Sequence, residues 1–231
     1  MKRKLMLSVY LISVFFALSA QVKIHKHITV EDGLVQSQVA SILEDSSGYL
    51  WFGTFGGVSR WNGHDFKNYR TQDGLVGGRV VAMVQNKNGD IYFGIDGGGV
   101  NVFRKGKMDT ISINQKFAGK SVTSLYLDKF NVLYIGTFGD GIYKYVIDAK
   151  STEKQVVQLS TKGGLKSNNV WAIAEGRPGE LLIGYDGGGL DIYKDGKITN
   201  YGTKVGLGGA SAAHKARRRA PPRPPCRRKA R

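Results

Sequence analysis

Two glycine-rich runs are the part of this chain that most resembles a chemical site: GIDGGG from Gly94 and GYDGGG from Gly184. Such runs can hold a phosphate group when a helix follows them, because the N–H groups of the first helical turn then point at the phosphate. Each run here leads instead into a second apolar segment typical of a strand. We therefore interpret both as turns between strands, in which Asp96, Asp186 and the related Asp140 are turn residues and not metal ligands.

Histidine, serine and carboxylate side chains form no pattern that predicts catalysis or metal binding. His25 and His27 flank Lys26, His64 lies in an expected hairpin turn, and His214 lies near the C-terminus. None of them has the helical spacing or the carboxylate partner of a zinc site. The sequence shows no serine-centred nucleophile elbow and no pair of carboxylates that marks one cleft. We predict no catalytic residues, no metal and no cofactor; an enzyme acting on a glycan is the weaker alternative.

Three tryptophans could stack on sugar rings, since an aromatic face packs against the C–H face of a pyranose. Trp51 and Trp171 lie in apolar strand patterns, and we expect both to pack in the core. Trp61 lies beside an expected exposed turn and is the candidate ligand contact, with packing between sheets as its alternative role. The sequence defines no other ligand-binding residue.

The elements that position these residues are set by a motif that occurs four times. A short apolar strand ends in Gly and is followed by a turn and a second strand: LWFGTFGGVSRW from Leu50, IYFGIDGGGVNVF from Ile91, LYIGTFGDGIYKY from Leu133 and LLIGYDGGGLDIY from Leu181. The structural repeat glycines are Gly53, Gly94, Gly136 and Gly184, which are separated by 41, 42 and 48 residues. This period is typical of β-propeller blades.

A second marker has the same phase, because a new unit opens at Gly33-Leu34, Gly74-Leu75, Gly164-Leu165 and Gly206-Leu207, with Ala118-Gly119 in the remaining slot. In the first unit we expect strands at 39–44, 50–54, 58–61 and 64–69, with an Asn62-Gly63 hairpin turn before the last. The sequence thus predicts an all-β protein: a β-propeller with about four four-stranded blades, at residues 33–73, 74–118, 119–163 and 164–205.

Both faces of each expected blade are apolar. The position two before each repeat glycine holds Trp51, Tyr92, Tyr134 or Leu182, and the next position holds Phe52, Phe93, Ile135 or Ile183. Adjacent residues of a strand point to opposite faces of a sheet, so each blade needs a neighbour on both sides. A fifth unit only begins before the composition changes. We therefore expect an incomplete, open propeller with an exposed apolar terminal face that can self-associate.

The two ends of the chain differ from the repeats at 21–207. Residues 1–20 have the basic, apolar and small-residue zones of a signal peptide, and no segment of the mature chain is long enough to span a membrane. Residues 208–231 hold nine Lys and Arg, four Pro and no Asp or Glu. We expect this tail to be disordered, and its abrupt onset suggests a frameshifted or foreign sequence. Because the tail supplies much of the net charge of +16, the repeats themselves are only modestly basic, and we predict no nucleic-acid partner. An arginine-rich arm that binds nucleic acid or an anionic surface is the weaker alternative for the tail.

The stretch GLVQSQVASILEDSSGYLWFGTFGGVSRWNGHDFKNY, from Gly33 to Tyr69, closely resembles the two-component regulator propeller repeat. The resemblance rests on Gly33, Leu34, Val39, Ile42, Asp45, Gly48, Leu50, Trp51, Gly53, Thr54, Gly57 and the Asn62-Gly63 turn. It implies the periplasmic sensor region of a hybrid two-component histidine kinase, which responds to a carbohydrate-derived signal such as an oligosaccharide. The kinase domain of such proteins is not present in this chain, so we expect no enzymatic activity. The alternative is a propeller scaffold that binds a protein partner through its rim.

Overall fold

The computed structural model describes residues 27–111, 114–117, 119–147 and 156–201. The expected signal peptide, the basic tail and the longer outer connection of the third unit lie outside these ranges. The described residues form sixteen strands in four four-stranded sheets, and within each sheet the strands pair antiparallel in chain order. The prediction of an all-β propeller with four-stranded blades is confirmed.

Each sheet is one blade, numbered here in chain order. Blade 1 comprises β1 (Val39–Glu44), β2 (Leu50–Thr54), β3 (Val58–Trp61) and β4 (Phe66–Tyr69); blade 2 comprises β5 (Val80–Gln85), β6 (Ile91–Ile95), β7 (Gly99–Arg104) and β8 (Lys107–Thr110). Blade 3 comprises β9 (Val122–Leu127), β10 (Val132–Thr137), β11 (Ile142–Val146) and β12 (Val156–Leu159); blade 4 comprises β13 (Val170–Glu175), β14 (Leu181–Tyr185), β15 (Leu190–Lys194) and β16 (Lys197–Tyr201).

Three single 3₁₀ turns complete the described elements: η1 (Thr71–Asp73), η2 (Asn114–Phe117) and η3 (Thr161–Gly163). Within the described ranges, no helix has the length and apolar content of a membrane span.

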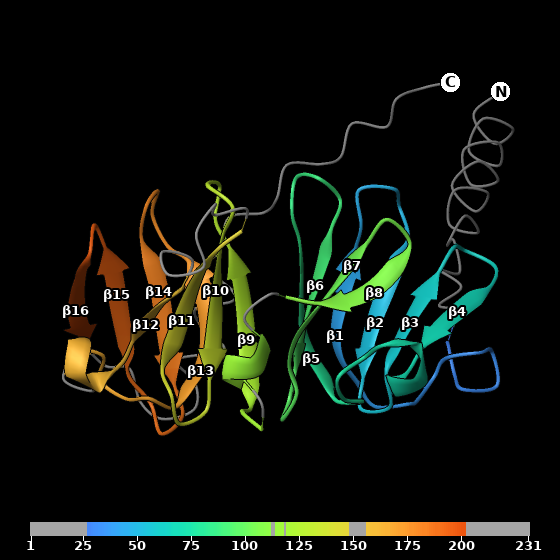
Figure 1. Ribbon diagram of the computed structural model, residues 1–231, viewed down its shortest axis with the longest axis horizontal. Helices are drawn as coiled ribbons and strands as arrows, with labels where there is room; N and C mark the ends of the chain where they lie inside the picture. The colour runs from blue at the N-terminus through green and yellow to red at the C-terminus, as the bar shows by residue number, and fades with distance from the viewer. Residues whose placement is uncertain (1–26, 112–113, 118, 148–155, 202–231) are drawn as a thin grey trace, which may run out of the picture.

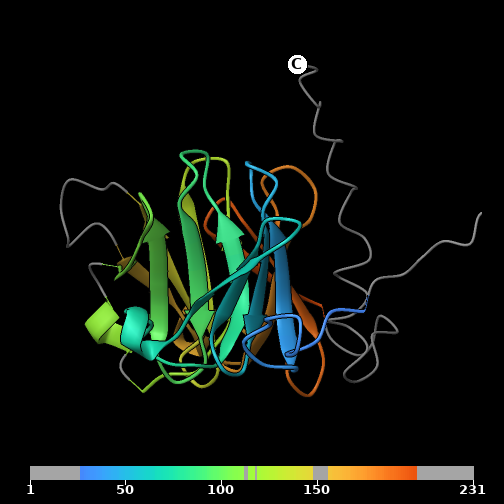
Figure 2. The ribbon, with the colours of Figure 1, turned by 90° about the vertical axis from the view of Figure 1, so that its right-hand side faces the viewer.

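The first strands of the blades form the centre of the molecule. β1 contacts β5, β5 contacts β9, and β9 contacts β13, so the blades radiate from a common axis. Blades 1 and 2 lie on one side of Figure 1 and blades 3 and 4 on the other. Seen from the side of blades 1 and 2, the strands run roughly alongside one another, and the turns therefore gather at two opposite edges (Figure 2).

Three apolar cores join neighbouring blades. We call the face of a blade that points toward the preceding blade its N-face, and the face that points toward the following blade its C-face. Trp51 on the C-face of blade 1 shares a core with Phe93 on the N-face of blade 2. Tyr92 and Ile135 meet in the same way between blades 2 and 3, and so do Tyr134 and Ile183 between blades 3 and 4. The expectation that both faces of a blade are apolar because both are covered holds at these three junctions.

A hydrogen bond from the backbone to a buried side chain, which we call the polar tether, explains the Gly-Leu marker. Leu34, Leu75 and Leu165 are buried, and each follows a glycine with positive φ that turns the chain into the next inner strand. The backbone N–H after each leucine donates to a buried polar side chain on the third strand of the same blade: Val35 to Ser59, Val76 to Asn101 and Lys166 to Asp191, at 2.9 Å in each case.

Blade 3 replaces this tether with a different pair. Gly119 also has a positive φ, but no leucine follows it, and Tyr143 occupies the third-strand position. Lys120 Nζ donates to the Tyr143 hydroxyl at 2.8 Å and pairs with Asp140 Oδ2 at 3.1 Å. The hydrogen bond to Tyr143, followed by the contacts with Asp140, raises the pKa of Lys120. The apolar anchor and the polar tether have therefore changed together in this blade.

One strand begins later than the sequence predicts, and one turn is built without glycine. The last strand of blade 1 begins at Phe66 and not at His64, because Asn62 Oδ1 accepts the N–H groups of both His64 and Asp65 and thereby lengthens the turn. In blade 3 the first turn has no glycine, and Asn131 adopts φ 61° instead, a conformation that asparagine tolerates better than most residues.

Buried tyrosines make the fold sensitive to alkali. Burial is the main cause that raises the pKa of Tyr92 and of Tyr134 from 10.0 to about 12, and it also raises the pKa of Tyr126 and Tyr185. Because the folded-state pKa values are raised, the stability that these neutral phenols contribute is complete below pH 10 and is lost as the pH rises through about 12.

We therefore expect loss of the β-sheet circular dichroism signal and appearance of phenolate absorbance to coincide between about pH 10 and about pH 12. Tyr92→Phe, which removes one titrating group, should move the transition to higher pH. Phenolate absorbance that rises fully near pH 10 while the sheet signal stays constant would contradict this account.

Candidate ligand-binding cavity at the inner strands

A cavity of about 1000 Å³ lies where the four inner strands meet. Its walls come from β1, β5, β9 and β13 and from the turns at one end of them, and they include Ser41, Ile42, Val81, Thr123, Ser124, Trp171 and Ala172. This volume is at the upper end of the range of small-molecule sites in proteins. The cavity is the candidate functional site because every blade contributes to it and because it contains exposed aromatic rings.

A β-bulge at the same position of every inner strand shapes the wall. The pairing with the second strand skips one residue near the start of β1, β5, β9 and β13. The four skipped residues all line the cavity: Ala40, Val81, Thr123 and Trp171. A bulge interrupts the alternation of a strand and redirects one side chain. Four bulges in register therefore turn four side chains toward one space.

Trp171 is the bulged residue of β13, and 54% of it is exposed. The prediction that Trp171 packs in the core is wrong. Its strand looks continuous and apolar in the sequence, but the bulge breaks the alternation at this residue and leaves Val170 and Ile173 to fill the core against blade 3. Next to it, Thr123 Oγ1 donates to the Val170 carbonyl at 2.6 Å and joins the bulges of blades 3 and 4.

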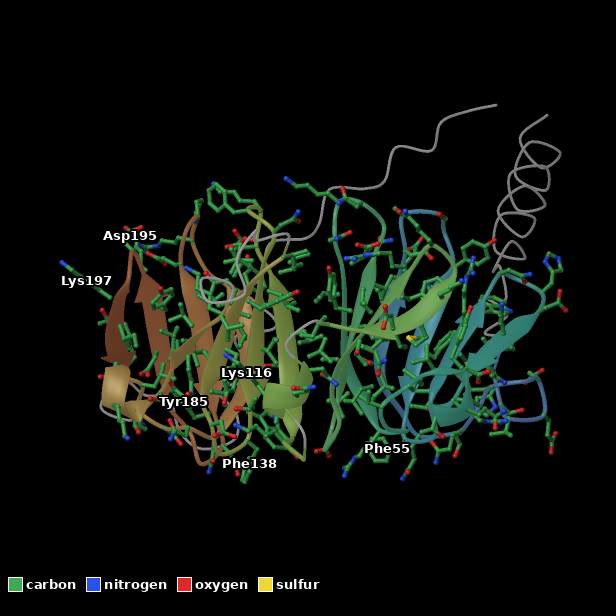
Figure 3. The ribbon with its side chains drawn as sticks, in the orientation of Figure 1. Phe55, Lys116, Phe138, Tyr185, Asp195 and Lys197 are labelled. Atoms are coloured by element: carbon green, nitrogen blue, oxygen red, sulfur yellow. The ribbon has the colours of Figure 1, made fainter. Side chains whose placement is uncertain are left out.

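A chain of contacts crosses one end of the cavity from blade to blade. The Arg79 guanidinium lies 4.3 Å from the centre of the Phe55 ring of blade 1 and 3.1 Å from Asp96 Oδ2 of blade 2. Asp96 Oδ1 in turn accepts a hydrogen bond from Ser121, which precedes blade 3, and the backbone N–H of Phe138 donates to the Ser121 carbonyl at 3.0 Å. The rings of Phe55 and Phe138 are both exposed, and both lie at the same edge of the molecule in Figure 3.

The position two residues after each repeat glycine alternates between blades: it is Phe55, Asp96, Phe138 and Asp186 in turn. The four residues are held by one backbone contact, since the N–H of each donates to the carbonyl of the residue that precedes its own inner strand. Three of the four, Phe55, Asp96 and Phe138, line one end of the cavity, so a carboxylate lies between two apolar rings in blade order there. Sequence reasoning noted the aspartates but missed the two phenylalanines, whose signal was this alternation.

Electrostatically the cavity is close to neutral. Arg79 and Asp96 are the only charged side chains among the described residues that line it, and they form an ion pair with each other. Three aromatic rings, Phe55, Phe138 and Trp171, line the same cavity. Such a surface suits a neutral ligand that offers both apolar C–H faces and hydroxyl groups.

The repeat glycines lie on the second strands, at points where the inner strand of the same blade and the following blade both come close to the glycine. A Cβ added at Gly53 would lie 2.4 Å from Ser41 Oγ, one at Gly136 would lie 2.4 Å from Ser124 Oγ, and one at Gly94 would lie 2.9 Å from Val122. Gly184 holds the corresponding position in β14, opposite Ala172. These positions set how closely the inner strands approach, and so they shape the cavity wall.

The other residues singled out by the sequence lie elsewhere. Trp51 is buried between blades 1 and 2, as expected. Trp61 is half-buried at the end of β3, where its ring stacks on Phe66 at 6.2 Å, and it does not line the cavity. His27 and His64 are exposed, whereas His25 and His214 lie outside the described ranges. In the part of the chain that the structure describes, no three His, Cys, Asp or Glu side chains gather in a group that could hold a metal ion.

The turn aspartates make local contacts. Asp96 is paired with Arg79 and Asp140 with Lys120, and Asp186 Oδ1 accepts the N–H of Gly187 at 3.1 Å. Their places in the turns after β6, β10 and β14 agree with their interpretation as turn residues.

Comparison with known proteins supports the repeat assignment. Residues 33–56 match the two component regulator propeller family, and the resemblance seen in the sequence is confirmed. A stretch of 47 residues is 47% identical to histidine kinase P4 of Formosa agariphila; it makes up 20% of this chain and 3% of that protein. The chain therefore carries at least one repeat of this family.

Solved structures place the fold. The extracellular domain of a hybrid two component system from B. thetaiotaomicron superposes with a TM-score of 0.66 and 26% identity over 76% of this chain and 24% of that one. Virginiamycin B lyase from Staphylococcus aureus superposes with a TM-score of 0.56 and 14% identity over 77% of this chain and 58% of that one, a likeness of fold alone. The chain thus spans about a quarter of the extracellular domain that it matches.

Proposed function

We propose that this chain is a ligand-sensing propeller segment of a hybrid two-component system, exported to the periplasm, and that it contributes to recognition of a carbohydrate-derived signal. The observation that carries the proposal is the cavity at the inner strands, whose lining includes three exposed aromatic rings and one ion pair. Support for the signalling context comes from the matched repeat and from the likeness to an extracellular domain of a hybrid two component system. We assign no phosphotransfer step to any residue that lines this cavity.

The chemistry of the cavity favours a neutral oligosaccharide. Trp171 offers an exposed ring that can pack on the C–H face of a pyranose. Arg79 can donate N–H groups to ring hydroxyls, and Asp96 can accept their protons in hydrogen bonds. Because the two charges already neutralise each other, an anionic sugar gains little from Arg79 and is repelled by Asp96.

Tryptophan fluorescence and calorimetry on the full chain test this proposal with cellohexaose, xylohexaose, maltohexaose and an oligogalacturonate as probes. We expect at least one neutral probe to bind with a blue shift of the emission. Trp171→Ala should weaken that binding by about 10-fold or more, since stacked aromatic contacts are worth roughly 1–3 kcal/mol in comparable sites. Trp61→Ala is the matched control and should leave binding within about two-fold.

Three results would overturn the proposal: binding of none of the probes, equal binding by the Trp171→Ala variant, or stronger binding of the oligogalacturonate than of every neutral probe. Loss of binding in Trp61→Ala alone would restore Trp61 as the ligand contact and move the site to the outer part of blade 1. A stable protein partner together with no affinity for any glycan would favour the scaffold role.

A further inference from the structure

We propose that this chain associates head to tail, with the C-face of blade 4 in one copy packed against the N-face of blade 1 in a second copy. The contact repeats the packing that joins neighbouring blades within the chain. This inference does not depend on the ligand or on the signalling role.

The N-face of blade 1 has the residues of a covered face. Three rows of equivalent residues show this: Val39 corresponds to Val80, Val122 and Val170, Trp61 to Phe103, Tyr145 and Tyr193, and Phe66 to Met108, Val156 and Ile198. Every one of these counterparts in blades 2, 3 and 4 packs in a core between blades.

On blade 1 the inner part of the same face is exposed at Val39 and Ile42, whereas Phe52 in the second strand is buried. Ile42 is 64% exposed, whereas its counterparts Leu125 and Ile173 are 8% and 9% exposed. The third counterpart, Met83, is partly buried in the core between blades 1 and 2. An exposed isoleucine in a row whose other members all pack against the preceding blade indicates a surface that a neighbouring blade can cover.

The C-face of blade 4 is the complementary surface. Leu182 corresponds to Trp51, Tyr92 and Tyr134, and Leu190 corresponds to Val58, Val100 and Ile142, all of which are buried against the following blade. Tyr201 is 37% exposed, whereas its counterpart Tyr69 is 6% exposed. In Figure 3, Asp195 and Lys197 mark the turn that leads into β16, the outer strand of this uncovered blade.

Charge complementarity favours a second copy as the occupant. Between blades 1 and 2, Gln85 Oε1 accepts the N–H of Ser46 at 2.9 Å. Glu44 of blade 1 is equivalent to Gln85 of blade 2, and Arg177 of blade 4 is equivalent to Ser46 of blade 1. In the head-to-tail contact, Glu44 and Arg177 would therefore take the positions of Gln85 and Ser46. Glu44 and Arg177 are both exposed in the chain. The contact therefore brings a carboxylate next to a guanidinium where the internal junction has a neutral hydrogen bond.

The contact joins two different surfaces, so it is heterologous: it closes into a ring if the rotation permits and otherwise continues as an open array. Two copies with four blades each place eight blades around one axis, within the range of about four to eight blades found in closed propellers. A closed dimer is the expected species.

Sedimentation of the full chain between about 1 µM and about 1 mM, a range that covers weak to moderate affinities, measures the association. Of the two contact surfaces, Ile42→Glu alters the N-face of blade 1 alone, and Leu182→Glu alters the C-face of blade 4 alone. Each should raise the dissociation constant by about 100-fold or more, because each buries a charge at the centre of the contact. Val157→Glu, at an exposed position of β12, is the control and should leave it within about two-fold.

The decisive sample is an equal mixture of the Ile42→Glu and Leu182→Glu variants. The first keeps an intact C-face and the second keeps an intact N-face, so the mixture should form a one-to-one complex although neither variant associates alone. A wild-type chain that stays monomeric over the whole range, or a mixture that stays monomeric while the wild type associates, would overturn the proposal. A monomeric wild-type chain is also expected if residues of the same chain outside the described ranges cover the N-face of blade 1 and the C-face of blade 4.

Exchanging the charges of Glu44 and Arg177 provides a second test of the contact. A folding defect in the glutamate variants does not affect this test, because both exchanged residues are exposed. Glu44→Arg alone and Arg177→Glu alone should each weaken association by about 10-fold. The double variant should recover most of the loss. Absence of any recovery would remove Glu44 and Arg177 from the contact and would count against the head-to-tail arrangement.

Discussion

Trp51→Ala is expected to lower the free energy of unfolding by about 4 kcal/mol, the upper part of the range for deletion of a large core side chain. Trp51 is 1% exposed, and its ring packs against Tyr69 of its own blade and against Phe93 and Phe103 of blade 2, with centroid distances of 5.8, 5.7 and 5.0 Å. Its Nε1 also donates to Asp45 Oδ2 at 2.8 Å. One substitution thus removes packing within a blade, packing between blades and the hydrogen bond that closes the first turn.

Urea denaturation followed by circular dichroism measures this loss. The repeats themselves supply a control: Trp51→Tyr introduces the residue that blades 2 and 3 carry at this position, and should cost about 1 to 2 kcal/mol. Trp171→Ala should cost less than about 1 kcal/mol because its ring is exposed. Equal losses for Trp51→Ala and Trp171→Ala would show that the core between blades 1 and 2 is not as described.

Asp191→Ala is expected to lower the free energy of unfolding by about 3 kcal/mol, because it leaves buried donors without an acceptor. Asp191 is fully buried. It accepts hydrogen bonds from the Tyr185 hydroxyl at 2.5 Å, the Lys166 N–H at 2.9 Å and Asn200 Nδ2 at 2.8 Å. The carboxylate thereby holds the segment that leads into β13 against the third strand of blade 4.

Asp191→Asn is the matched control, since blade 2 uses Asn101 for the same tether. An amide keeps one acceptor oxygen for the Lys166 N–H, so we expect a loss of about 1 kcal/mol. The two variants are compared by urea denaturation, and hydrogen exchange at Lys166 reports the tether itself. An alanine variant as stable as the asparagine variant would exclude the proposed role of the carboxylate.

The phase of the blades was predictable because it rests on residues with strong local preferences. Gly33, Gly74 and Gly164 adopt positive φ before a buried leucine, and the turns at Lys105-Gly106 and Asp195-Gly196 have positive φ at both residues, as a two-residue hairpin turn of type I′ requires. Each of these features involves only neighbours in sequence, so it can be read without knowledge of the tertiary structure.

The cavity was not predictable in the same way because it depends on a register shift between strands. Trp171 lies in an apolar run that fits a core strand, and only the pairing of β13 with β14 reveals the bulge that exposes it. The contacts of Arg79 with Phe55 and Asp96 join different blades. Trp61 illustrates the converse: its counterparts Phe103, Tyr145 and Tyr193 pack between blades, but this comparison needs the strand register.

Disulfide trapping across the mouth of the cavity tests the central claim, that equivalent sheets stack around one axis and that adjacent blades together build the site. Asp96 of blade 2 and Ser121 before blade 3 form an isolated antiparallel bridge, so Asp96→Cys and Ser121→Cys, combined with Cys226→Ser, should form an intramolecular disulfide rapidly under mild oxidation. Asp96→Cys with Gln158→Cys, which reaches to the outer strand of blade 3, should not. Absence of the first disulfide, or equal formation of both, as measured by mass spectrometry of the oxidised full chain, would contradict the account.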